Sequence, residues 1–236
     1  MTDEELTALY NEVDSIFFDD YLNDKTIKYV NDLISEGFHV TYDDAYQYAE
    51  RVGELSGKAF RKVFMNEDLP DGFTDEIIEK VIKPRVEMDH SIVHDMVDAV
   101  QRSLNEEAGL SIKAQEAQLR GVKLNSMLNN LTSSEDFDLG LKHFESELVD
   151  FTMSVVDDSI EENIRAQYDA GLEPTITRTA VGAKPCKWCQ NLAGTYVYSY
   201  RTPTDIFRRH DNCRCTLTFI PASGRKQNAW SKKYMQ

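Results

Sequence analysis

All four cysteines and one of the five histidines of this chain lie close together near its C-terminal end. They form two groups, Cys186-Lys187-Trp188-Cys189 and His210-Asp211-Asn212-Cys213-Arg214-Cys215. Thiolates and an imidazole brought together from two tight turns are the ligands that a tetrahedral zinc ion takes in proteins. The spacing therefore predicts that the C-terminal part folds around a metal ion.

Five candidate ligands compete for four places at such an ion. Cys186 and Cys189 are separated by two residues, so one turn delivers both thiolates. His210 and Cys213 have the same spacing, but Cys213 and Cys215 compete with that pair because residues two apart on a strand share a face. The ligands are thus either four cysteines, with His210 donating a hydrogen bond to a thiolate, or three cysteines and His210. Two disulfides are the alternative to a metal.

The composition is that of a folded protein with no membrane-spanning segment. Of the 236 residues, 41% are apolar and 28% are charged, and this length suits one or two domains. No run of 18 apolar residues occurs, and three of the first five residues are acidic, whereas a signal peptide would be basic and then apolar. We expect a cytosolic protein, or one exported by another route. In a reducing compartment clustered cysteines favour a metal over disulfides.

Charge is distributed unevenly along the chain, whose formal net charge is -15. Residues 1–171 carry 38 acidic and 15 basic side chains, whereas residues 172–236 carry 3 acidic and 11 basic ones. Opposed charges suggest two domains with different partners: the acidic half should avoid nucleic acid, and the basic half could contact it. The basic residues expected to contact DNA phosphates or an acidic protein surface are Arg201, Arg208, Arg209, Arg214, Arg225, Lys226, Lys232 and Lys233. The alternative for the last 14 residues is a solvated, disordered end.

Hydrophobic periodicity predicts helices before residue 171 and strands after it. A first helix is expected to begin at Thr2, and a second to cover 41–65. A third is expected over 74–104, where Pro84 either kinks the helix or marks its true start, and a less clear one over 111–130. The last is expected to begin with a cap at 132–135 and to end at Gly171. Short alternating, β-branched segments then predict strands at 175–181, 195–198 and 215–220. Such a sheet is too thin to build a sizeable core, so metal binding would supply folding free energy.

These patterns give an α+β fold. It has an acidic helical domain (1–171), a small β-rich, zinc-stapled module (172–222) and a basic tail (223–236). A site closed by four protein ligands leaves no place for water, so we expect a structural zinc ion and no enzymatic activity. A nuclease would need a general base and separate ligands for a divalent ion, yet His210 is the only imidazole of the C-terminal half.

The same residues carry a resemblance to a known family. Cys-x-x-Cys, then Leu192-x-Gly194, a short strand, and finally His210-x-Asn212-Cys213-Arg214-Cys215 resemble the C-terminal motif of the phage Mu F-like minor head, or head-morphogenesis, proteins. The resemblance covers residues 176–220. Two positions depart from the family: Ala193 stands where aspartate is frequent, and Asp211 where proline is frequent. Neither change removes a ligand.

The resemblance implies a low-copy virion protein of a tailed bacteriophage. Such a protein is assembled in the host cytoplasm, enters with the portal and lies inside the head near it, where some members affect DNA packaging or ejection. The expected partners are portal and capsid proteins, and no membrane is expected to be involved. Whether the chain also contacts packaged DNA stays open. The alternative is a zinc-module protein that processes nucleic acid, either a nuclease or a toxin-like protein.

Overall fold

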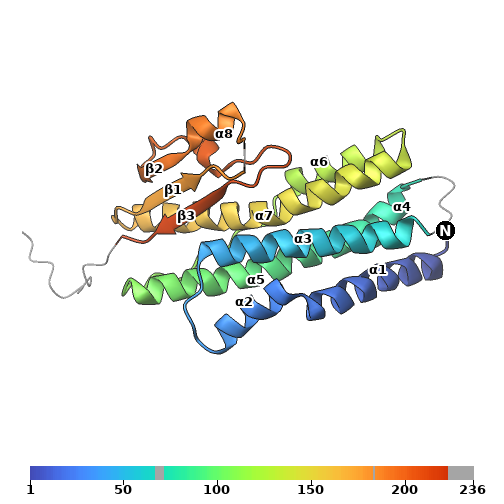
Figure 1. The fold of residues 1–236 in the computed structure, drawn as a ribbon, viewed down its shortest axis with the longest axis horizontal. Helices are drawn as coiled ribbons and strands as arrows, with labels where there is room; N and C mark the ends of the chain where they lie inside the picture. Colours follow the sequence, from blue (N-terminus) through green and yellow to red (C-terminus); the bar gives the residue numbers. More distant parts are fainter. Residues whose placement is uncertain (67–71, 183, 223–236) are drawn as a thin grey trace, which may run out of the picture.

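Two long antiparallel helices form the centre of the helical body, α3 (Tyr42–Phe64) and α7 (Phe137–Asp169). The computed structural model describes residues 1–66, 72–182 and 184–222. A Cβ at Gly53 of α3 would lie 2.6 Å from the Thr152 hydroxyl oxygen and 2.7 Å from the Val149 Cα. The absence of a side chain at Gly53 therefore allows the two helices to approach closely (Figure 1).

Helices α1 (Asp3–Asn23) and α2 (Lys25–Ser35) cover the side of α3 that faces away from the sheet (Figure 1). Thr2 begins α1 and Thr41 begins α3, as predicted, and each has a complete capping box. Helix α2 was not predicted. Its N-cap is Asp24, whose carboxylate accepts hydrogen bonds from two backbone N–H groups and also pairs with Arg51 of α3 at 2.6 Å.

The helix expected over 74–104 is a continuous helical rod with an irregular turn. It consists of α4 (Asp75–Ile77), a π-helical turn η1 (Ile78–Ile82) and α5 (Lys83–Glu107). Pro84 lies in the first turn of α5, immediately after the π-helical turn. Proline lacks a backbone N–H and crowds the preceding turn, so the regular helical ladder cannot run through it. Pro84 thus marks the start of α5.

The helix expected over 111–130 is correct only in its second half, α6 (Gly121–Thr132). Residues 110–120 run without helix along α7, where the side-chain amide of Asn163 bonds both backbone groups of Gln115, at 2.8 and 3.0 Å. The predicted cap of α7 is also wrong. The hydroxyls of Thr132 and Ser133 bond the Asn129 carbonyl at the end of α6, and Asp136 caps α7 instead.

Helix α7 ends where predicted, because Gly171 adopts a left-handed backbone with φ of 81°. The three predicted strands follow as an antiparallel sheet in the order β2-β1-β3: β1 (Thr175–Thr179), β2 (Gly194–Val197) and β3 (Thr216–Ile220). The short helix α8 (Lys187–Leu192) and the 3-10 turn η2 (Thr204–Phe207) lie between the strands. The α+β fold class is confirmed.

The sheet does not rely on its own core. The inward-facing side chains of the sheet and η2 belong to the same hydrophobic cluster as the buried residues of α3 and α7; they are Ile176, Ile206, Phe207, Leu217 and Phe219. Figure 1 shows the sheet and α8 lying on the opposite side of the α3–α7 pair from α1 and α2. The helical body therefore provides much of the burial that this small sheet cannot provide alone.

Candidate metal centre

The first pair of cysteines is positioned by the start of α8. Cys186 is the N-cap residue, and its sulfur accepts a hydrogen bond of 3.3 Å from the backbone N–H of Cys189. Cys189 lies one turn further on and is buried. The two intervening residues thus bring both sulfurs to one end of a helix, as the spacing predicts.

The second group lies in the turn that leads from η2 into β3. The Cys213 N–H donates to the His210 carbonyl at 3.1 Å, and Asn212 adopts a left-handed backbone with φ of 59°. Asp150 of α7 accepts the Asn212 N–H at 2.5 Å and holds this turn against the helix. Cys213 and Cys215 are both buried, and Cys215 immediately precedes β3.

All five predicted ligands converge, in two groups of three that share Cys189. One group contains Cys186, Cys189 and His210, the other Cys189, Cys213 and Cys215, and within each the ligand atoms lie within 4.8 Å of one another. The His210 Nε2 lies 3.3 Å from the Cys186 sulfur and 3.0 Å from the Cys189 sulfur, and the sulfurs of Cys189 and Cys213 are 3.8 Å apart. Two sulfurs bound at about 2.3 Å to a tetrahedral ion lie about 3.8 Å apart. The cluster could therefore hold a metal ion.

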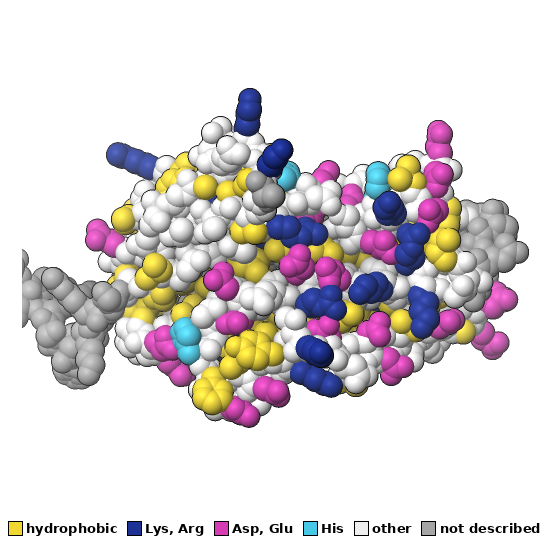
Figure 2. Space-filling view, viewed as in Figure 1, with side chains coloured by type: hydrophobic (Ala, Val, Ile, Leu, Met, Phe, Trp, Pro, Cys, Tyr) yellow, Lys and Arg dark blue, Asp and Glu magenta, His cyan; other side chains and the backbone are white. Residues whose placement is uncertain are grey.

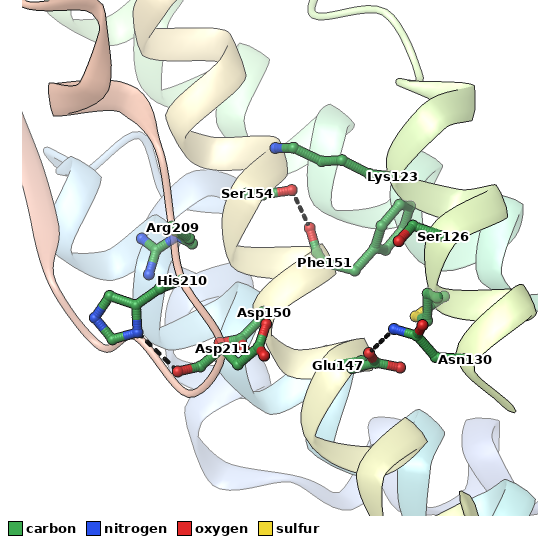
Figure 3. Close-up of a pocket in the computed structure, with 11 residues that line it drawn as sticks. Lys123, Ser126, Asn130, Glu147, Asp150, Phe151, Ser154, Arg209, His210 and Asp211 are labelled. Carbon is green, nitrogen blue, oxygen red and sulfur yellow. Dashed lines mark hydrogen bonds between the residues drawn. The ribbon is translucent and has the colours of Figure 1, made fainter. Parts of the chain in front are cut away.

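The imidazole of His210 is oriented as a metal ligand requires. Its Nδ1 lies 2.8 Å from the backbone carbonyl of Asp211, a contact drawn in Figure 3, so Nδ1 carries the proton and donates it there. The lone pair of Nε2 then faces the two sulfurs. Hydrogen bonding through the other ring nitrogen is the usual way in which proteins fix a metal-binding histidine.

The thiols differ in how readily they lose a proton. The backbone N–H of Cys189 lowers the pKa of Cys186, whereas burial and the neighbouring thiols raise the pKa of Cys189. Burial also raises the pKa of Cys213. At Cys215 burial acts in the same direction, but a backbone hydrogen bond from Val181 helps to lower its pKa overall. A bound cation would favour the thiolate form of every sulfur that it contacts.

Arg209 is held inside the molecule, which corrects its predicted role as a contact for an outside partner. Its side chain is 5% exposed and pairs with Asp157 of α7. Arg214 pairs with Asp150 and Glu50 at 3.0 and 2.9 Å. Arg201 and Arg208 are exposed. The other predicted contacts, Arg225, Lys226, Lys232 and Lys233, lie outside the described residues.

A cleft of about 300 Å³ adjoins the cluster, between α6, α7 and the turn at 209–211 (Figure 3). His210 and Asp211 line one wall, and Glu147 and Asp150 come from α7. Burial raises the pKa of Glu147, which Asp211 and Asp150 raise further. Burial likewise raises the pKa of Asp150. The sequence did not predict this cleft, because its carboxylates come from the helical half.

Arg178 is a further residue of the site that was not predicted, although the sequence carries a signal for it. Arg178 occupies an inward-facing position of β1, where the alternation of the strand calls for an apolar side chain, and it is buried. A buried charge in such a place requires an explanation.

Comparisons of the chain with protein-family models, with curated proteins and with solved structures found no match. Within the part of the chain that the structure describes, no helix is both long and apolar enough to cross a membrane.

Proposed function

We propose that this chain is a minor head protein of a tailed bacteriophage that acts by binding and is stapled by a structural zinc ion. The observation that supports this most directly is the convergence of Cys186, Cys189, His210, Cys213 and Cys215, the residues that carry the resemblance to the Mu F-like family. The proposed partners are portal and capsid proteins, met in the host cytoplasm during assembly and then inside the head near the portal.

The donor set suits zinc. Thiolates and an imidazole are borderline-soft ligands that zinc accepts in closed tetrahedral sites, and His210 is already held in the ligating tautomer. When bound, the ion would join α8 to the turn before β3. Cys186 and Cys189 would hold it from the helix start, and the turn would supply either Cys213 and Cys215, or His210 with one of these two cysteines. These ligands would thereby fix the position of the surface around Arg208, and none of them would catalyse a reaction.

The proposed binding surfaces differ in charge. Figure 2 shows basic side chains interleaved with acidic ones along the helical body, consistent with ion pairs such as Arg61–Asp138 at 2.6 Å. Arg201 and Arg208 are exposed on the C-terminal module. Among the residues that the structure describes, they remain candidates for contact with DNA phosphates or an acidic protein. The acidic helices are the proposed contact for capsid or portal protein.

A nuclease or toxin-like activity is the second candidate, because the cleft places Glu147 and Asp150 beside the His210 turn. However, both ring nitrogens of His210 are already engaged, one by the Asp211 carbonyl and one by the cysteine sulfurs. An imidazole held in this way cannot act as a general base. Metal-dependent cleavage of DNA or RNA that His210→Ala abolishes without loss of zinc would favour this candidate instead.

Particle assembly tests the proposed function. The chain is expressed together with the portal and major capsid proteins of its own phage, and procapsids are separated on a density gradient. We expect the chain to sediment with particles in low copy number. A Cys189→Ser, Cys213→Ser chain is the matched control and should be incorporated poorly. A wild-type chain that stays in the soluble fraction while portal-containing particles form would exclude the proposal.

A further inference from the structure

Arg178 lies directly behind the metal centre. Its side chain points inward from β1 and the residue is 2% exposed. One terminal nitrogen donates to the Ile206 carbonyl, and the other donates to the Arg208 carbonyl at 3.0 Å and lies 3.8 Å from the Cys213 sulfur. The guanidinium carbon is 5.4 Å from the centre of the Trp188 ring.

The partners of this guanidinium differ from those of the other buried arginines, which pair with carboxylates. Arg85 pairs with Asp14 and Asp89, and Arg209 pairs with Asp157. Over residues 1–66, 72–182 and 184–222 no ion pair involves Arg178, whose charge meets only backbone carbonyls, an aromatic ring and a cysteine sulfur. An uncompensated buried charge strongly destabilises a fold, so a counter-charge is expected nearby.

We propose that the counter-charge is the metal–thiolate centre itself, and that Arg178 is a positioning residue that raises the affinity of this centre for zinc. This inference rests on the zinc ion of the proposed function. Zinc carries two positive charges, so three thiolates with His210 give a centre of charge -1, and four thiolates give -2. The centre is anionic with either ligand set, and a buried cation 3.8 Å from one sulfur stabilises it in both.

The same guanidinium also fixes the approach of the ligands. By holding the carbonyls of Ile206 and Arg208, it sets the path of the chain that leads to His210. A lysine at this position would keep the charge but lose the planar fork that reaches two carbonyls. A glutamine would keep a donor but lose the charge. The two substitutions therefore separate the electrostatic contribution from the geometric one.

The test measures zinc affinity by competition with a chromophoric chelator, using Zn²⁺ with the full chain. Arg178→Gln should weaken binding by about 10- to 100-fold, the range typical for residues that support metal ligands. Arg178→Lys should remain within about fivefold of the wild-type affinity, because the charge is retained. The matched control is Lys187→Gln, which removes an exposed positive charge between Cys186 and Cys189 and should change affinity by less than about twofold, because solvent screens it.

Co²⁺ spectra of the same variants report the coordination, since thiolate-to-metal charge-transfer bands that persist in Arg178→Gln show an intact ligand set. An unchanged zinc affinity for Arg178→Gln overturns the inference, and so does a loss in Arg178→Lys as large as in Arg178→Gln. If Arg178→Gln does not fold with zinc present, the lysine variant decides alone: affinity near that of the wild type supports the role of charge, and a tenfold loss overturns it. A wild-type chain that binds no zinc contradicts the proposed zinc site, which is a separate outcome.

Discussion

Arg209 and Asp157 form a buried ion pair that fixes the cysteine-bearing turn to the helical body. Their side chains are 5% and 1% exposed, and the Arg209 Nη2 lies 3.2 Å from the Asp157 Oδ1. Arg209 also donates to the carbonyls of Cys213 and Cys215 at 2.9 and 2.8 Å. Tyr46 of α3 donates its hydroxyl hydrogen to Asp157 at 2.6 Å. One carboxylate thus connects α3, α7 and the turn that carries Cys213 and Cys215.

Breaking this pair should destabilise the whole chain. In Arg209→Met the Asp157 carboxylate stays buried without its cation, which typically costs about 3–5 kcal/mol. The neighbouring Arg208 pairs with Asp205 at 3.1 Å with a side chain that is 70% exposed, so Arg208→Met should cost at most about 1 kcal/mol. Urea denaturation followed by far-UV circular dichroism measures both. Equal effects of the two substitutions would contradict the anchoring role of Arg209.

Cys189 should be the least replaceable of the five candidate ligands, because it is the member common to both groups of three. Cys189→Ser is expected to lose bound zinc completely. Among the other candidates, His210→Ala should retain one zinc per chain if the ligands are four cysteines, and should lose it if His210 is a ligand. Metal content per chain, measured by mass spectrometry with plasma ionisation, gives the result. One zinc ion still bound to Cys189→Ser would show that the shared sulfur is not a ligand.

The close contact of α3 with α7 predicts different effects of alanine at two glycines one turn apart. Alanine improves helix propensity by about 1 kcal/mol at either position. At Gly53 the new methyl group would lie 2.7 Å from backbone of α7, and such overpacking costs about 1–3 kcal/mol. At Gly57 the nearest atom is 3.2 Å away, so the strain is smaller. Thermal unfolding should show a lower midpoint for Gly53→Ala and little change for Gly57→Ala. A stabilised Gly53→Ala would show that the helices separate easily.

The features that the sequence predicts correctly are those encoded locally. Thr2 and Thr41 begin helices through side chains that bond their own first turns, and Gly171 ends α7 through its own backbone angle. The two-residue spacing of Cys186 and Cys189 likewise predicts the turn that brings their sulfurs together. Each of these signals lies within a few residues, so a single sequence is sufficient to find it.

The features that were missed depend on distant partners. From the sequence Arg209 was predicted to be a surface cation, because Asp157, its partner in the fold, lies 52 residues earlier. Residues 111–120 have a composition compatible with helix, but Asn163, 48 residues away in sequence from Gln115, occupies their backbone groups. Tertiary contacts of this kind override local propensity, and the sequence alone does not state which residues meet.

Asn163 should therefore control the order of the extended segment. Replacing it with alanine removes both hydrogen bonds to Gln115 and leaves these backbone groups without their partner, which typically costs about 1–3 kcal/mol. Trypsin should then cleave more rapidly after Lys113. Asn130→Ala, which removes an exposed hydrogen bond to Glu147, is the control and should leave this cleavage unchanged. Identical cleavage rates in wild type and Asn163→Ala would mean that other contacts hold the segment.

Asp158 should make stability depend on pH. Burial raises its pKa from 3.8 to about 6, despite Lys123 and Arg120 at 3.4 and 3.0 Å. The folded chain therefore binds this proton more tightly than the unfolded chain, so the stabilisation is fully present below pH 3.8 and is lost as the pH rises through 6. A difference of about two in pKa between the folded and the unfolded chain corresponds to roughly 3 kcal/mol of folding free energy.

Asp158→Asn removes this titration while keeping a polar side chain of similar size. The variant should be more stable than the wild type at pH 7.5, by an amount on the order of 1–3 kcal/mol, because it buries no charge. The difference should shrink towards pH 4, where Asp158 of the wild type is protonated in the folded state. Measuring both chains by urea denaturation at each pH cancels the titration of the remaining groups, including the thiols. A difference that is constant between pH 4 and 7.5 would show that Asp158 does not titrate in this range.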